Sequence, residues 1–116
     1  MKNAIDKAMH DGITALVEHL HQDYAKGFDE PHDEVAKWML ERNTWEVDTS
    51  GRNYWRVTHI DGTSRCATAF VVAKPTKGFK RGDILKAATY KAPATNFKRG
   101  NVFDRDFSRV TWAGCH

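Results

Sequence analysis

One segment of the chain has apolar side chains on both faces of a strand, and this feature restricts the fold most. Residues 66–73 read CATAFVVA and carry no charge. A strand with one face in water alternates apolar and polar residues, whereas a continuous apolar run is typical of a strand buried on both sides. The sequence therefore predicts a central strand over residues 66–73, with covering layers above and below it.

The neighbouring segments predict the partners of this strand. Residues 45–47 and 54–60 have the composition of strands, and the turn signals Ser50-Gly51 and Asp61-Gly62 separate the predicted strands from one another. A fourth strand over residues 83–88 follows a Lys77-Gly78 turn. We expect an antiparallel sheet of about four strands within residues 44–90.

The first 43 residues have a helical pattern instead. Residues 3–25 predict an amphipathic helix that stops near Gly27, because their apolar residues recur at intervals of three and four: Ile5, Met9, Ile13, Leu16, Val17, Leu20 and Tyr24. A second helix is predicted from Pro31 to near Asn43, with Asp29 as its cap. The side chains expected to be buried there are Val35, Trp38 and Met39.

After Pro93 the pattern of regular structure is lost, and only one short element is expected, over residues 102–107. A chain of 116 residues is long enough for one domain with a buried core. The predicted fold is a single α+β domain: two N-terminal helices (1–43) packed on a small antiparallel sheet of about four strands (44–90), followed by a long basic C-terminal loop segment (91–116).

Charge is distributed unevenly along the chain. Residues 1–58 carry 7 Lys/Arg and 11 Asp/Glu, a net charge of −4, and residues 59–116 carry 11 and 4, a net charge of +7. A basic half of this kind is a candidate surface for an anionic partner. Alternatively, the two halves pack side by side and their fields cancel.

The tetrapeptide Phe-Lys-Arg-Gly occurs twice in the basic half, at residues 79–82 and 97–100. Cations bind phosphate, glycine lets backbone amides approach an anion, and an aromatic ring can stack on a base. This combination predicts a ligand site made of Lys80, Arg81, Lys86, Tyr90, Lys91, Lys98, Arg99 and Asn101. Alternatively, the phenylalanines hold two loops on the core, and Arg99-Gly100-Asn101 staples a loop to the sheet.

No motif in the chain specifies a reaction, so the sequence favours a non-enzymatic protein and assigns no catalytic residue, cofactor or metal ligand. His19 and His21 diverge on a helix, and Cys115-His116 has no second ligand pair at zinc-site spacing. These residues are interpreted as solvated helix histidines and a frayed terminus. A Cys–His or Ser–His–Asp nucleophilic site stays open, because its members meet in space rather than in sequence.

Several features bear on where the protein acts. No run of about 18 apolar residues is present, so no membrane contact is expected. The first 22 residues lack the apolar core of a secretion signal, and two cysteines, Cys66 and Cys115, are too few for a disulfide scaffold. The sequence therefore predicts a cytoplasmic protein with reduced thiols.

Four short motifs follow one another in the second half: RCATAFV at 65–71, GDILKAA at 82–88, YKAPA at 90–94 and RGNVF at 99–103. Together they resemble a group of small accessory proteins of tailed bacteriophages, and the resemblance covers about residues 54–104. It implies a viral protein made in the cytoplasm of the infected host. Tyr90 stands where a Trp is expected in that group, and the turn over residues 74–81 is longer than usual.

These observations lead to a hypothesis with two alternatives. The first is a non-enzymatic protein that binds a phosphate-bearing ligand, nucleic acid foremost, through its basic C-terminal half. The second is an anti-defence inhibitor that binds a host defence or metabolic protein and uses the charge asymmetry for steering. The third is a binder of a small nucleotide signal.

Overall fold

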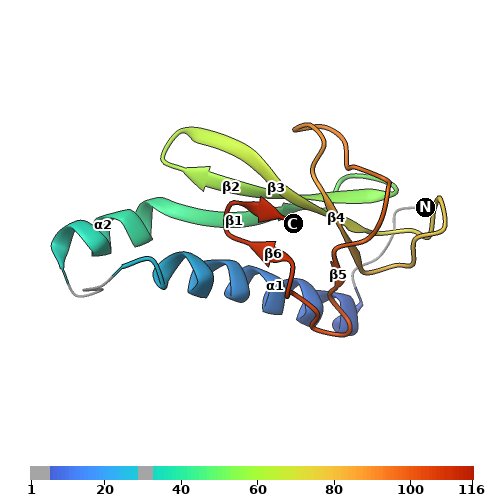
Figure 1. Ribbon diagram of the computed structural model, residues 1–116, viewed down its shortest axis with the longest axis horizontal. Coiled ribbons are helices and arrows are strands. Elements are labelled where there is room, and N and C mark those ends of the chain that lie inside the picture. The colour runs from blue at the N-terminus through green and yellow to red at the C-terminus, as the bar shows by residue number, and fades with distance from the viewer. Residues whose placement is uncertain (1–5, 29–32) are drawn as a thin grey trace.

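The computed structural model describes residues 6–28 and 33–116 and has an α+β fold (Figure 1). A five-stranded antiparallel sheet has the order β1-β2-β3-β4-β5, and β6 and β7 form a separate hairpin. Neither described helix has the length and apolar character of a membrane span. The elements are α1 (Lys7–Ala25), α2 (Glu34–Arg42), β1 (Asn43–Asp48), β2 (Tyr54–Asp61), β3 (Ser64–Val72), β4 (Asp83–Lys86), β5 (Gly100–Asn101), β6 (Val110–Thr111) and β7 (Gly114–Cys115).

Helix α1 confirms the amphipathic pattern in the part that the structure describes. Asp6 is its N-cap, and the carboxylate accepts a hydrogen bond of 2.8 Å from the Met9 amide. The helix ends at Ala25, the predicted last residue, with Lys26 as C-cap, and Ile5 lies outside the described residues. The buried residues repeat at intervals of three and four and face β1 and the β6–β7 hairpin: Met9, Gly12, Leu16, Leu20 and Tyr24.

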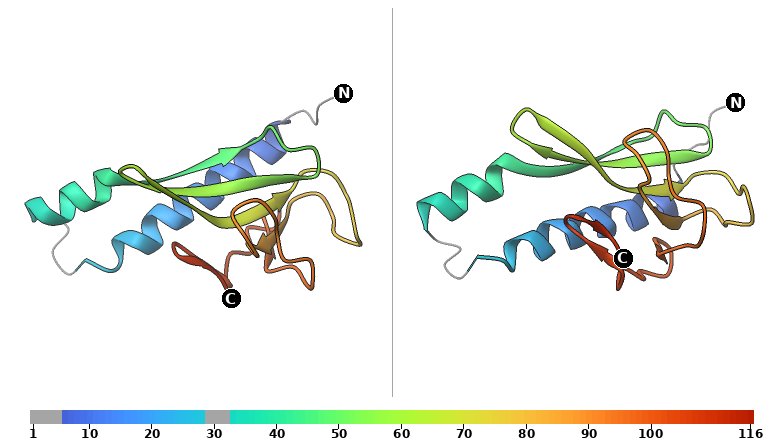
Figure 2. Two further views of the ribbon diagram at one scale, coloured as in Figure 1. Left: turned by 90° about the horizontal axis from the view of Figure 1, so that it is seen from above. Right: turned by 45° about the horizontal axis from the view of Figure 1, so that its top comes forward.

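Helix α2 differs from the prediction. It begins at Glu34 with Asp33 as N-cap, and the predicted start near Pro31 with the cap Asp29 lies outside the described residues. The predicted burial of Val35 and Trp38 is wrong, because they are 66% and 54% exposed. Ala36 is the one buried residue of this helix, which contacts β1 and α1 at one end of the molecule (Figure 2).

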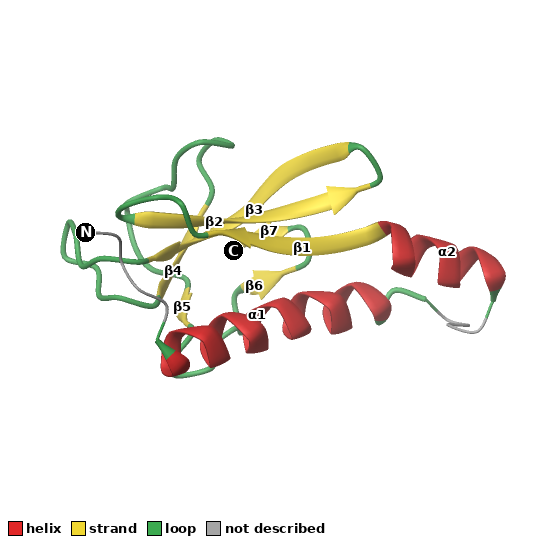
Figure 3. Ribbon diagram, turned by 180° about the vertical axis from the view of Figure 1, so that it is seen from behind, coloured by secondary structure: helices red, strands yellow, loops and turns green. Residues whose placement is uncertain are grey.

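Strand β3 is central in the sheet, as its sequence predicts. On one face Ala69 and Val71 join the main core under α1. On the other face Phe70 and Val72 form a second small core with Leu85, which Phe79 and Ala87 partly cover. Figure 3 shows α1 along one side of the sheet and the loop between β4 and β5 rising on the opposite side. The apolar run is therefore explained by two covering layers of different size.

The predicted fold, with two N-terminal helices packed on about four strands and a long basic loop after them, is wrong. The sheet has five strands, α1 alone lies along it, and strands continue to Cys115. The short element expected over residues 102–107 consists of turns. Strands β5, β6 and β7 have two residues each, too few to produce an alternating pattern in the sequence.

The C-terminal hairpin is held along α1, so the interpretation of a frayed terminus with solvated histidines is also wrong. His19 Nε2 lies 2.7 Å from the Val110 carbonyl oxygen, and the Trp112 amide donates to Asp23 at 3.0 Å. Cys115 is buried against β3 and β4. The C-terminal residues therefore complete the main core from the side of α1.

Candidate functional site

The two Phe-Lys-Arg-Gly segments meet in the sheet. The first opens β4 and the second leads into β5, so that Asp83 lies opposite Asn101 and Ile84 opposite Gly100. Gly82 has a φ of 91°, and a Cβ there would overlap the Phe103 ring. A Cβ on Gly100 would overlap the Asp106 carbonyl oxygen. Both glycines are therefore required by close backbone packing.

Asn101, one of the predicted ligand residues, is buried beside Asp83. Its Nδ2 donates to Asp83 Oδ1 at 2.8 Å, and its Oδ1 accepts from the amides of Phe103 at 2.8 Å and Asp104 at 3.2 Å. Lys98 also reaches Asp83, with Nζ 3.7 Å from Oδ1, and the Lys80 amide donates to Oδ2 at 2.9 Å. Asp83 thus gathers three of the predicted site residues in a network that holds two loops together.

Arg81 and Arg99 contact different residues. Arg81 Nη1 donates to Asp6 Oδ2 at 2.8 Å, and its guanidinium lies 5.9 Å from the centre of the Phe103 ring. The hydrogen bond from Arg81 lowers the pKa of the Asp6 carboxyl group. Arg81 therefore links the start of β4 to the start of α1.

Arg99 is 5% exposed, although it lies in a basic loop. Its guanidinium carbon is 3.8 Å from the centre of the Phe97 ring, and Nη2 is 3.4 Å from Asn96 Oδ1. The Nε and Nη1 atoms are buried and have no hydrogen-bond partner. Among the residues that the structure describes, no carboxylate lies within ion-pair distance of Arg99.

The positive charges of Lys86 and Arg99 both affect the pKa of the buried Cys115 thiol. Burial raises the pKa of the Cys115 thiol to about 11, and the positive charges of Arg99 and Lys86 oppose this shift. The Lys86 side chain is exposed, whereas Cys115 is 7% exposed. Two of the predicted cations are therefore near one another, one at the surface and one beneath it.

Tyr90 and Lys91 lie on the long loop between β4 and β5, next to an arginine that the sequence analysis missed. Arg56 of β2 donates from Nε to the Tyr90 carbonyl oxygen at 2.8 Å, and its guanidinium lies 4.2 Å from the centre of the Tyr90 ring. Arg56 Nη1 also lies 3.6 Å from Asp48 Oδ2. An arginine at an alternating polar position of a strand gives no sequence signal for this contact.

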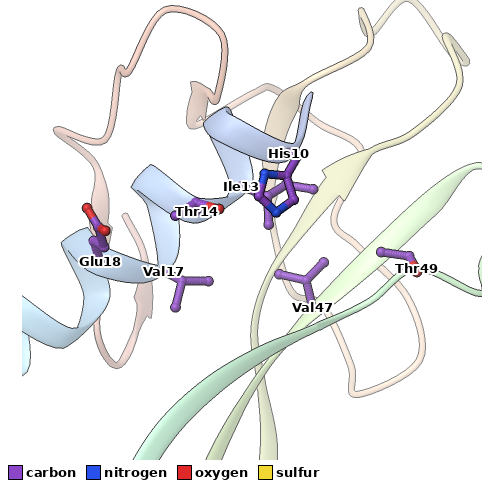
Figure 4. Close-up of a pocket in the computed structure, with 7 residues that line it drawn as sticks. All are labelled: His10, Ile13, Thr14, Val17, Glu18, Val47 and Thr49. Atoms are coloured by element: carbon purple, nitrogen blue, oxygen red, sulfur yellow. The ribbon is translucent and has the colours of Figure 1, made fainter. Parts of the chain in front are cut away.

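A groove between α1 and β1 and the distribution of possible metal ligands are two further features of the structure. An apolar groove lies between α1 and β1, and Figure 4 shows that Ile13, Val17 and Val47 line it, with His10 and Glu18 at its rim. No group of three His, Cys, Asp or Glu residues in the described chain could hold a metal ion. Neither feature offers the convergent polar groups that define a chemical site.

The comparisons with known proteins give a family but no activity. Neither the curated proteins nor the solved structures include a match to the chain. The model of a family of unknown function, DUF7717, matches residues 1–116, and the protein therefore belongs to this family.

Proposed function

We propose that the protein binds a phosphate-bearing ligand, single-stranded nucleic acid foremost, and that Arg99 is the residue that takes the phosphate. The observation that carries this proposal is the buried guanidinium of Arg99, in which Nε and Nη1 have no partner. A planar guanidinium holds phosphate through two hydrogen bonds. Nε shares one donor edge of the guanidinium with Nη2, and Nη1 shares the other, so either edge can hold a phosphate once Asn96, which lies 3.4 Å from Nη2, turns away.

The energetics of Arg99 support a missing anion. A buried charge without a partner costs several kcal/mol. The cation–π contact between the buried guanidinium and the Phe97 ring offsets about 2 kcal/mol of this cost, the value for a contact shielded from water. A bound phosphate would supply the remaining compensation, because charge-assisted hydrogen bonds to an anion are stronger than neutral ones.

The basic half of the chain also has exposed rings and cations that suit a polymer of nucleotides. Three exposed aromatic rings, on Tyr90, Phe97 and Phe103, each have an arginine within 6 Å. Exposed rings of this kind stack on bases of any sequence. Exposed lysines of this half include Lys86 in β4 and Lys91 and Lys98 on the loop between β4 and β5.

Access to Arg99 requires a local movement. Residues 95–98 are exposed, and two of them contact the Arg99 guanidinium, Phe97 through its ring and Asn96 through Oδ1. The Ala94 amide donates to the Lys86 carbonyl oxygen, and the Arg99 amide donates to the Ile84 carbonyl oxygen. Between these two hydrogen bonds, no backbone–backbone hydrogen bond holds residues 95–98 in the described structure. We expect Phe97 and Asn96 to turn away from Arg99 when a phosphate binds, at a low cost in free energy.

The salt dependence of binding tests the electrostatic part of the proposal. If Arg99 and the three lysines each contact a phosphate, the logarithm of the binding constant should fall with the logarithm of salt concentration at a slope of about −3. Fluorescence anisotropy of a labelled oligothymidylate at several salt concentrations measures this slope. A slope near zero would exclude phosphate contacts and leave contact with another protein as the better explanation of the basic surface.

The variant Arg99→Met tests the assigned residue. We expect oligonucleotide affinity to fall about 10- to 100-fold, because hydrogen bonds to a charged group contribute about 1.5–3 kcal/mol. The melting temperature should stay constant or rise, because an apolar side chain of similar volume removes a buried unpaired charge. The matched control is Arg81→Met, which removes a guanidinium that has a carboxylate partner in Asp6.

The two measurements on Arg99→Met separate the alternatives. Lower affinity at unchanged stability supports a ligand-binding arginine. A melting temperature that drops by several degrees, with affinity unchanged in the folded fraction, would make Arg99 a structural residue of the loop and overturn the proposal.

A further inference from the structure

Three polar residues on adjacent strands form a chain of contacts that the proposed binding function does not use. Cys66 Sγ of β3 lies 3.9 Å from His59 Nδ1 of β2, and His59 Nε2 lies 2.8 Å from Asn43 Oδ1 at the start of β1. The sheet register places His59 directly opposite Cys66. A thiol, an imidazole and an amide therefore lie in line across three strands.

The hydrogen bonds of Asn43 determine where the proton on His59 lies. Asn43 Nδ2 is 2.7 Å from the Met39 carbonyl oxygen, which can only accept, so the amide nitrogen must face Met39. The amide oxygen then faces His59 and also can only accept. His59 consequently carries its proton on Nε2, and the lone pair of Nδ1 points at the Cys66 thiol.

The imidazole is held rigidly in an apolar setting. Trp45 stacks on it with ring centres 4.6 Å apart and planes inclined by 7°. Trp112 meets it edge-on, with ring centres 5.8 Å apart. Burial lowers the pKa of His59, and the charge of Asp61 partly opposes this. His59 is therefore a neutral base at pH 7.

Other titratable groups around His59 come from every element packed against it. Tyr24 and His21 of α1 belong to the same aromatic cluster, and burial raises the pKa of the Tyr24 hydroxyl group. Asp61 of β2 is paired with Arg42 of α2. Tyr24 stays uncharged near neutral pH, and Arg42 partly neutralises Asp61.

Cys66 differs from the second cysteine in its access to solvent. Cys66 is exposed, whereas Cys115 is buried. Cys66 is also among the residues around a cleft of ≈ 360 Å³, but Ala67 and Ala87 of this cleft pack on the second core, on the face of the sheet opposite His59. β3 pairs with β4 only over Ala69–Val71, so Cys66 lies in the part of β3 that β4 does not cover.

We propose that Cys66, His59 and Asn43 form a nucleophilic thiol centre that takes an acyl group from an ester or amide carbonyl that reaches the exposed thiol at this uncovered part of β3. Cys66 is the nucleophile, His59 is the general base, and Asn43 is a positioning residue that fixes the tautomer of His59. Neighbouring nucleophile and base, with the base oriented by a third group, are the geometric requirements of such a centre.

The reaction balances with these residues and water alone. His59 Nδ1 takes the proton of the Cys66 thiol as Sγ bonds to the carbonyl carbon. The bond from this carbon to the leaving oxygen or nitrogen breaks, and His59 returns the proton to the leaving group, which leaves a thioester on Cys66. Water then attacks the thioester with His59 as base, and the proton returns to Sγ.

Acetylation by p-nitrophenyl acetate tests the centre in the intact protein. We expect a burst of about one p-nitrophenolate per chain at pH 7, with the acetyl group found on Cys66 by mass spectrometry. The burst rate should exceed that of N-acetylcysteine about 100-fold, the usual contribution of a positioned general base. Cys115 is an internal control that should remain unmodified, and Cys66→Ser should abolish the burst.

The pH profile of the unaltered protein provides a test that needs no variant. An ordinary thiol of pKa about 8.5 is about 1% thiolate at pH 6.5 and about 75% at pH 9, so its rate rises about 75-fold over this interval. Assistance by His59 should reduce the rise to less than about tenfold. A profile of the ordinary thiol would overturn the proposal.

The variants His59→Phe and Asn43→Ala distinguish catalysis from support of the fold. His59→Phe keeps a ring on Trp45 and removes the base. Both variants should acetylate Cys66 about 10- to 100-fold more slowly than the parent at pH 6.5 but at the same rate at pH 9.5, where the thiolate forms without a base. Equal rates of parent and His59→Phe at pH 6.5 would refute the role of His59, and a loss that is the same at both pH values would indicate a structural role only.

Discussion

Replacement of Phe70 by alanine is expected to destabilise the protein by about 3–5 kcal/mol. Phe70 is 3% exposed and lies opposite Leu85 in the small core on the face of the sheet away from α1. This core has three buried residues, so few neighbours can move in to fill the cavity. The loss is a large part of the stability of a domain of this size.

Thermal and urea unfolding, followed by circular dichroism, measure the effect of Phe70→Ala. The melting temperature should fall by more than about 10 °C. Phe103→Ala is the matched control, because Phe103 is 37% exposed and should contribute less than about 1 kcal/mol. A melting point of Phe70→Ala within a degree or two of the parent would contradict the assignment of a second core.

Replacement of Gly100 by alanine is expected to cost about 3 kcal/mol, at the upper end of what overpacking usually costs. The added methyl group would overlap the carbonyl oxygen of Asp106, and backbone atoms cannot rotate away as a side chain can. Asp106 exchanges two backbone hydrogen bonds with Asn101, of 3.2 and 3.1 Å, and relief of the overlap would break them. The change therefore separates β5 from the turn that follows it.

Urea unfolding of Gly100→Ala measures this cost. The matched control is Gly27→Ala, because a methyl group there lies at an ordinary contact distance from the Tyr24 carbonyl oxygen. We expect the control to change stability by less than about 1 kcal/mol. Equal stability of the two variants would show that β5 and its turn do not pack as closely as described.

Long periodic segments of the sequence predicted their structure well. Helix α1 and strand β3 have enough residues for the spacing of apolar side chains to identify the element and its buried faces. Helix α2 shows the limit of this reasoning, because the spacing of Val35 and Trp38 would be the same on a buried or an exposed face. Contact with the rest of the chain decides between the two, and nine residues give no sign of it.

The candidate sites were less accessible to prediction. Lysines and arginines in a basic loop are expected at the surface, so the burial of Arg99 has no counterpart in the sequence. Asn43, His59 and Cys66 are separated along the chain by up to 23 positions and meet only through the register of three strands. Register depends on turn geometry and on a bulge near Thr58, and neither is encoded in a short motif.

The attachment of the C-terminal residues along α1 has a consequence for synthesis of the protein. The ribosome makes α1 well before Val102, Val110 and Cys115, which complete the core against it. Until these residues are made, the apolar stripe of the helix lacks part of its cover. The domain therefore reaches its native state in a late step that joins segments far apart in the sequence, and contacts of such long sequence separation slow folding.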